Sequence, residues 1–241
     1  MKQTGKSGRK KWQNLNGAAK LRYIWDYYKL PIFLICICVY GAGYLVWRNV
    51  TAEYTQLYLA YVNIEVGETL DHHLTEEFID YLHPDEKNST VKAIRNLALT
   101  ENLQKSDGSY VYTSQMKILS SIDNQQLDIV LMNQEAFDAF SQNGFLINLE
   151  AFAKEHGLTN LQPYFIDNIE ILSDNATEVI VDPTVEYHSE TTTYPMAIDI
   201  TEFPFILEAG FPDHVYLGII ANTERADNAA SFVSYLAGAL I

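Results

Sequence analysis

Cysteine and tryptophan are scarce in this chain of 241 residues and are confined to its first 49 positions. The two cysteines are Cys36 and Cys38, and the three tryptophans stand at positions 12, 25 and 47. The rest of the chain therefore offers no disulfide, no thiolate metal site and no cysteine nucleophile. A bound sugar would have to stack on tyrosine or phenylalanine there, which weakens a sugar-binding interpretation.

Basic residues are also scarce once the first 48 positions are passed. Residues 1–48 carry nine Lys and Arg against one acid, Asp26, whereas residues 49–241 carry seven against thirty, so charges of +8 and −23 make up the net −15. A segment at −23 repels phosphate backbones, which argues against a nucleic-acid partner. Small cationic solutes, peptides or a basic protein partner suit this charge better.

One long apolar run separates the basic and acidic parts. Eighteen residues from Leu30 to Trp47 carry no charge, and as a helix they would rise about 27 Å, close to the thickness of a bilayer core. Basic residues precede the run and aromatic residues flank it, as in single-pass anchors with a cytoplasmic N-terminus. Pro31 suits the first helical turn. Cleavage after the small residues Gly41, Ala42 and Gly43, or burial as a soluble core helix, are the alternatives.

These features predict four regions and a location in the cell membrane, with the lipid bilayer as the first partner. Residues 1–29 form a basic cytoplasmic tail, 30–47 a transmembrane helix, 48–56 a stalk, and 57–241 an extracytoplasmic domain.

The remainder of the chain alternates strand and helix patterns. Strands are expected at 57–64, 91–100, 110–112 and 127–132, and helices at 69–82 with Thr69 as cap, from 114, at 134–141 and at 149–156. This order is typical of an α/β fold with a parallel sheet and helical crossovers. Short β-type runs at 169–172, 178–181, 184–187 and 195–200 predict an antiparallel extension, followed by a strand at 215–221 and a C-terminal helix from Ala226.

Parts of this pattern resemble the first lobe of bacterial extracellular solute-binding proteins. The resemblance rests on residues 116–122, 127–131, Ala136, Phe137, Phe140 and 144–150, and on the ending 218–223 with Ala226, Ala229 and Ala230. It implies one α/β lobe that serves a transporter. Family members use two lobes that close on a solute, and this chain has room for only one. The basic tail, residues 23–29 and the span also resemble membrane proteins of Gram-positive gut bacteria, which implies a location but no activity.

Open α/β sheets bind ligands beyond the carboxyl ends of their strands, where loops and helix N-termini converge. The polar residues expected there are Asn63, Glu65, Asn133, Gln134, Glu135, Asp199 and Thr201. The structural alternative is that Asn133 caps the next helix and that Asp199 lies on an exposed strand face.

Catalytic motifs are missing from the sequence. There is no Gly-x-Ser-x-Gly elbow and no glycine-rich phosphate loop. His72 and His73 stand four residues before Glu76 and Glu77, but two ligands are too few for a metal. We expect no enzyme, no catalytic residue, no metal site and no cofactor.

The leading hypothesis is a solute-binding-like module beside a transporter. The alternatives are an interaction domain that docks another envelope protein, and a metal-dependent hydrolase in which His72 or His73 meets further carboxylates.

Overall fold

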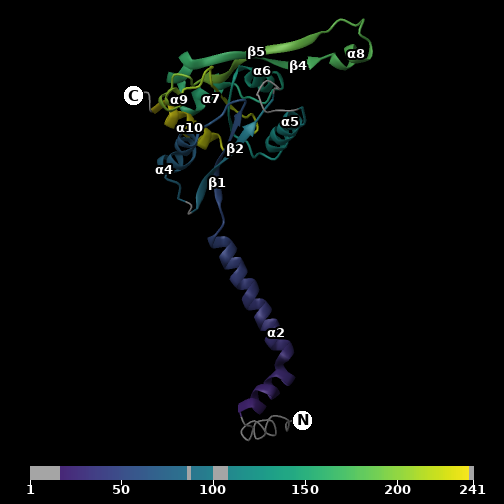
Figure 1. Ribbon diagram of the computed structural model, residues 1–241, viewed down its shortest axis with the longest axis vertical. Coiled ribbons are helices and arrows are strands. Elements are labelled where there is room, and N and C mark those ends of the chain that lie inside the picture. The colour runs from purple at the N-terminus through teal and green to yellow at the C-terminus, as the bar shows by residue number, and fades with distance from the viewer. Residues whose placement is uncertain (1–16, 86–87, 100–107, 239–241) are drawn as a thin grey trace. The chain divides into compact units, whose positions relative to one another are not determined.

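The computed structural model describes residues 17–85, 88–99 and 108–238 (Figure 1). The chain separates into two units, Met1–Ala52 and Glu53–Ile241.

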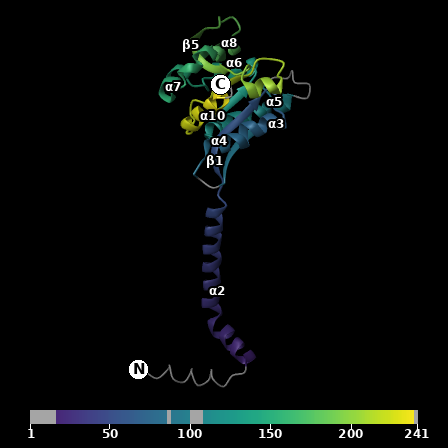
Figure 2. The ribbon, with the colours of Figure 1, turned by 90° about the vertical axis from the view of Figure 1, so that its left-hand side faces the viewer.

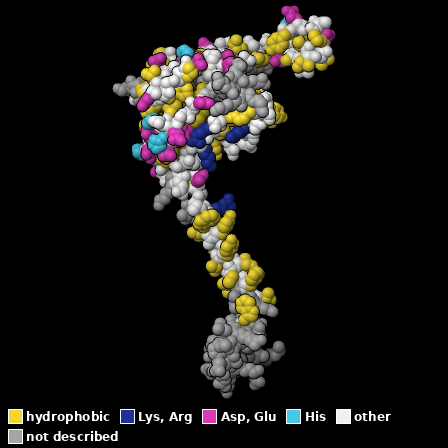
Figure 3. All heavy atoms as spheres, viewed as in Figure 1, with side chains coloured by type: hydrophobic (Ala, Val, Ile, Leu, Met, Phe, Trp, Pro, Cys, Tyr) yellow, Lys and Arg dark blue, Asp and Glu magenta, His cyan; other side chains and the backbone are white. Residues whose placement is uncertain are grey.

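The first unit is a single helix in its described part, α2, Gly17–Val50. Its described apolar side chains between Leu30 and Trp47 are exposed, and yellow atoms lie along this helix in Figure 3; Leu34, Ile35 and Val39, for example, are 65%, 60% and 66% exposed. Pro31 lies inside the helix, so the expectation that it occupies the first turn is wrong. Of the residues described, no helix combines the length and apolar character needed to cross a membrane. The predicted span 30–47 includes Ile32, whose side chain is outside the description, as are residues 1–16 of the predicted tail.

The second unit is a mixed α/β domain, as the strand and helix patterns predicted. Its described residues form a six-stranded sheet in the order β2-β1-β3-β6-β5-β4. The strands are β1 Tyr54–Val62, β2 Ser89–Leu97, β3 Ile129–Met132, β4 Phe165–Asp174, β5 Ser189–Asp199 and β6 Tyr216–Ile219. Strands β1, β2 and β3 are parallel, and β6, β5 and β4 continue the sheet antiparallel. The parallel sheet and its antiparallel extension are therefore both confirmed.

Helices cover both faces of this sheet. They are α3 Glu68–His72, η1 His73–Glu77, α4 Phe78–Leu82, α5 Gly108–Asp123, α6 Gln134–Gln142, α7 Leu149–His156, η2 Thr159–Tyr164, α8 Ala176–Val181, α9 Pro204–Ala209 and α10 Ala226–Gly238. Alternate side chains of a strand point to opposite faces, so Leu59 packs under α3, α4, α7 and α10, whereas Ala60 faces α5 and α6. Figure 2 shows α7 and α5 on opposite sides.

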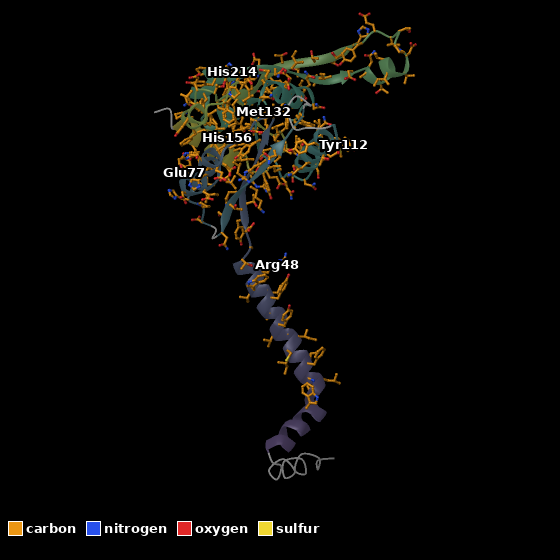
Figure 4. All side chains as sticks on the ribbon, in the orientation of Figure 1. Arg48, Glu77, Tyr112, Met132, His156 and His214 are labelled. Carbon is orange, nitrogen blue, oxygen red and sulfur yellow. The ribbon has the colours of Figure 1, made fainter. Side chains whose placement is uncertain are left out.

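Several local predictions are wrong. Residues 110–112 belong to α5, where Tyr112 is labelled in Figure 4, because Val111, Ser114, Ile118 and Ile122 share one buried helical face that outweighs their β propensity. Residues 178–181 lie in helix α8, and 184–187 form no strand. Thr69 is not a cap, since Gly67 holds that position. Strand β1 begins at Tyr54, inside the range expected to form the stalk.

A buried carboxylate joins the centre of the sheet to the start of α10. Asp128 is fully buried just before β3, and its side chain accepts hydrogen bonds from the Tyr58 amide of β1 (2.8 Å) and the Thr223 hydroxyl (2.6 Å). Arg225 Nη1 lies 3.3 Å from the same carboxylate, and its guanidinium lies 4.7 Å from the centroid of the Tyr58 ring. The charge is thus compensated by donors from β1 and from the loop before α10.

Replacing Asp128 with Ala should destabilise the domain by about 3 kcal/mol, because it leaves the Arg225 charge without its carboxylate and removes the acceptor of the Tyr58 amide. Urea unfolding followed by circular dichroism measures the loss. The matched control is Lys154→Ala, which breaks the exposed pair with Glu150 and should cost less than about 0.5 kcal/mol. Equal losses in the two variants would contradict this role for Asp128.

Candidate functional site

The predicted site residues that follow β1, β3 and β5 lie at one edge of the sheet. Strands β1 and β3 are parallel, and β5 runs in the same direction because both β3 and β5 pair antiparallel with β6. Asn63, Asn133 and Asp199 therefore stand at the carboxyl edge, as the topology argument predicted.

The side chains of Asn63 and Asn133 form a hydrogen bond with each other and do not face an open cleft. Asn63 is 7% exposed with a φ of 56°, and its Nδ2 donates to Asn133 Oδ1 at 3.2 Å. Its Oδ1 accepts the Leu99 amide at 2.7 Å. Asn133 Oδ1 also accepts the Ala136 amide at 3.1 Å and so caps α6, as the structural alternative predicted. Both side chains hold the loops that leave the sheet.

Gln134 and Glu135 are exposed in the first turn of α6. Gln134 Nε2 donates to Asp138 Oδ1 at 2.8 Å, and the same oxygen accepts Asn168 Nδ2 of β4 at 2.9 Å. Gln134 thus supports the contact between α6 and β4, while Glu135 is placed on the surface.

Asp199, Thr201 and His214 form a compact polar cluster at the end of β5. Asp199 Oδ1 accepts the Thr201 amide at 3.0 Å and its hydroxyl at 2.5 Å, and Asp199 Oδ2 lies 2.9 Å from His214 Nδ1. Burial opposes ionisation of Asp199, but the hydrogen bonds from Thr201 and His214 outweigh it and lower the pKa of the carboxyl. Asp199 was expected on an exposed strand face under the structural alternative; it is instead part of this cluster.

The same cluster does not have the geometry of a catalytic triad. In a triad the carboxylate binds one imidazole nitrogen and the nucleophile binds the other. Here the Thr201 hydroxyl lies 3.4 Å from His214 Nδ1, the nitrogen already in contact with Asp199. The Thr201 hydroxyl also accepts the Val215 amide at 3.0 Å. The arrangement fastens β5 to the segment that enters β6.

Glu65, two residues after Asn63, lines a pocket of about 300 Å³ whose lining does not include Asn63, Asn133 or Asp199. The wall is made by the start of α3 and by α9, with Glu68, His73, Phe205 and Glu208 among the lining residues. The ring of His73 stacks on Phe205 with centroids 4.6 Å apart. Three carboxylates at one small pocket favour a cation over an anion.

The paired histidines stand at the junction of α3 and the π-helical turn η1. His72 Nδ1 lies 3.1 Å from Glu76, and His73 Nδ1 lies 2.8 Å from Glu77. The Tyr235 hydroxyl of α10 donates to the His73 carbonyl in this turn at 3.0 Å. Burial, with the nearby charge of Glu77, raises the pKa of Tyr235 to about 12.

In the described ranges no three His, Cys, Asp or Glu side chains are placed to hold a metal; Glu77 and His214 lie well apart (Figure 4).

The predicted antiparallel extension takes the form of a long hairpin arm. Strands β4 and β5 pair from Phe165 and Ile198 to Asp174 and Ser189, and they extend beyond the helices to α8 (Figure 1). We call residues 165–199 the arm and residues 174–189 its tip. The predicted antiparallel extension indicated two more strands where the tip has a helix and turns.

The tip is held by its own hydrogen bonds. Asn175 donates through Nδ2 to the Glu186 carbonyl at 2.9 Å and accepts the His188 amide at 2.7 Å. Asp174 accepts the Ala176 amide at the start of α8. Despite these bonds, Ile180 and Val181 on α8 are each 80% exposed. The tip is therefore built as a structure that leaves two branched apolar side chains in solvent.

The base of the arm is fastened to the body. Asn168 Nδ2 of β4 donates to Asp138 Oδ1 of α6 at 2.9 Å, and β5 pairs antiparallel with β6 from Ala197 to Asp199. Within the arm, Glu170 Oε2 accepts the Tyr194 hydroxyl at 2.6 Å and joins β4 to β5. Gly144 lies against Glu170: its φ is +67°, and a Cβ there would come within 2.6 Å of Glu170 Oε1. The arm therefore leaves the body from a fixed position.

Comparison with protein-family models, with curated proteins and with solved structures gives no match. The resemblance to solute-binding proteins thus stays a hypothesis.

Replacing Asp199 with Asn should lower the urea midpoint at pH 7. The pKa of Asp199 is lowered in the folded chain from an ordinary value of 3.8, so its ionised form stabilises the fold above about pH 4. That stabilisation is lost as the pH falls through the native pKa, and the gap between variant and wild type should close there. Asp213→Asn, at an exposed neighbouring carboxylate, is the control. A gap that stays constant from pH 7 to pH 2 would contradict the assignment.

Proposed function

We propose that this protein is a membrane-anchored, non-enzymatic interaction module that docks another envelope protein through its arm. The observation that carries the proposal is the tip, where Ile180 and Val181 are each 80% exposed at the end of a hydrogen-bonded hairpin. Burying such side chains gains about 1.5–3 kcal/mol each. An arm that extends them beyond the body suits contact with another protein.

The anchor in this proposal is the segment Leu30–Trp47 of α2. What supports it is the exposure of Phe33, Leu34 and Ile35, consecutive residues that point in three directions around the helix. Apolar side chains on every side are stable in lipid and unfavourable in water. The excess of Lys and Arg in residues 1–29 favours a cytoplasmic N-terminus and an acidic domain outside the cell.

Solute binding is the second candidate, and the acidic pocket favours it. The pocket of about 300 Å³ lies beside Glu65, after β1, and near α9, after β5. It is therefore close to the strand ends where a solute-binding-like lobe would hold its ligand. Its carboxylates fit a small amine or a cationic peptide end. We rank it second because Asn63, Asn133 and Asp199 are engaged in the protein's own hydrogen bonds.

The full-length chain should stay in the membrane fraction after an alkaline carbonate wash. The double variant Ile35→Lys/Val39→Lys should lose this retention, because two charges in a bilayer core are costly. The control carries the same two charges on the arm, Ile169→Lys/Leu172→Lys, and should be retained. Release of the wild-type chain by carbonate would contradict the anchor, and protection of residues 53–241 from protease on intact cells would contradict the orientation.

A photo-crosslinking residue at position 180 should give a discrete adduct with a second protein in the cells that produce this chain. The control position is Tyr112, which is 64% exposed on α5 in the body, and it should give no such adduct. The two positions should differ because the proposed contact is the tip and not every exposed surface. The same adducts at both positions, or none at 180, would contradict docking through the arm.

A further inference from the structure

The arm lacks positive charge. No Lys or Arg occurs between Lys154 and Arg225, and these two residues are engaged with Glu150 and Asp128. Six acidic residues of the arm are exposed: Asp167, Asp174, Glu178, Asp182, Glu186 and Glu190. In Figure 3 the arm shows magenta and yellow atoms without dark blue. Charge and apolar surface are thus combined on one projecting element.

The fold stabilises the charged form of one of these carboxylates. The Asp182 carboxylate accepts hydrogen bonds from the Thr184 hydroxyl and amide, and these bonds lower its pKa. Asp174 accepts the Ala176 amide at 3.1 Å. Within the described ranges, none of the six carboxylates forms an ion pair with Lys or Arg of this chain. A binding partner can therefore supply the missing cations.

Building on the proposed function, we infer that the arm docks a basic segment of a partner protein in which Lys or Arg alternate with apolar residues. The cations pair with the exposed carboxylates, and the apolar residues cover Ile180 and Val181. Opposite charges that meet within the Debye length, about 8 Å at physiological salt, attract each other with little screening. Two arms from two copies would repel each other, and an anionic lipid surface or a nucleic acid would be repelled in the same way.

The test uses the full-length chain in neutral detergent and a labelled peptide of alternating Lys and Val. A peptide of alternating Glu and Val and one of alternating Lys and Gly are the comparison probes. Fluorescence anisotropy should show binding of the Lys-Val peptide that weakens by about tenfold between low and high salt. The Glu-Val peptide should not bind. The Lys-Gly peptide should bind more weakly, because it cannot cover the tip.

Two charge-matched triple variants locate the contact. Glu178→Lys/Glu186→Lys/Glu190→Lys reverses three exposed carboxylates on the arm, and Glu135→Lys/Glu155→Lys/Glu224→Lys reverses three exposed ones on the body. The arm variant should lose at least about tenfold in affinity, and the body variant should bind as the wild type does. Ile180→Ser/Val181→Ser should reduce the preference for Lys-Val over Lys-Gly without removing the salt dependence.

Equal losses in the two triple variants would overturn the inference, because they would show attraction to net charge alone. Tighter binding of the Glu-Val peptide, or no binding of any peptide, would overturn the basic character of the partner. The crosslink at position 180 separates these failures from failure of the proposed function: an adduct there with no peptide binding leaves docking intact and removes only the partner chemistry.

Discussion

The domain depends on the buried charge of Asp128. Its carboxylate is fixed by the Tyr58 amide, the Thr223 hydroxyl and the Arg225 guanidinium, and its backbone amide donates to the Tyr58 carbonyl at 3.0 Å. One residue thus sets the register of β1 against β3 and brings the segment before α10 against both strands. Because a buried charge is costly unless its partners are in place, the parallel half of the sheet and the return of the chain must form together.

Because the contacts of Asp128 stabilise the body, the body can support a long arm at one edge of the sheet. The body is closed by β1, β3, β6 and α10, and β4 and β5 are added at the far edge of the sheet. A two-stranded hairpin alone is marginally stable in water, so the arm depends on the bond from Asn168 to Asp138 and on the pairing of β5 with β6 at its base. The body therefore supplies the stability that the hairpin lacks on its own.

The sequence predicted well those elements whose pattern is fixed by burial. Apolar runs predicted β1 and β3, and helical spacing predicted α7 and α10. The position of Asn63, Asn133 and Asp199 at one carboxyl edge of the sheet followed from the predicted topology. It could not predict what those side chains bind, because hydrogen-bond partners such as Leu99 and His214 come from distant segments. Residues 178–181 read as a strand because Val and Ile favour strands, but the short helix α8 is set by local bonds at Asp174 and Asn175.

The contrast between the carboxyl edge and the arm is what favours the arm as the proposed contact surface. At the edge, polar groups such as Asn63 are nearly buried and satisfied by the chain itself, so they have little capacity left for a ligand. On the arm, the same chain leaves apolar side chains and carboxylates in solvent. The hydrogen bonds that order the tip do not require apolar side chains at positions 180 and 181. Exposed apolar surface reduces solubility unless something covers it. The arrangement is explained if the arm's complement is another molecule.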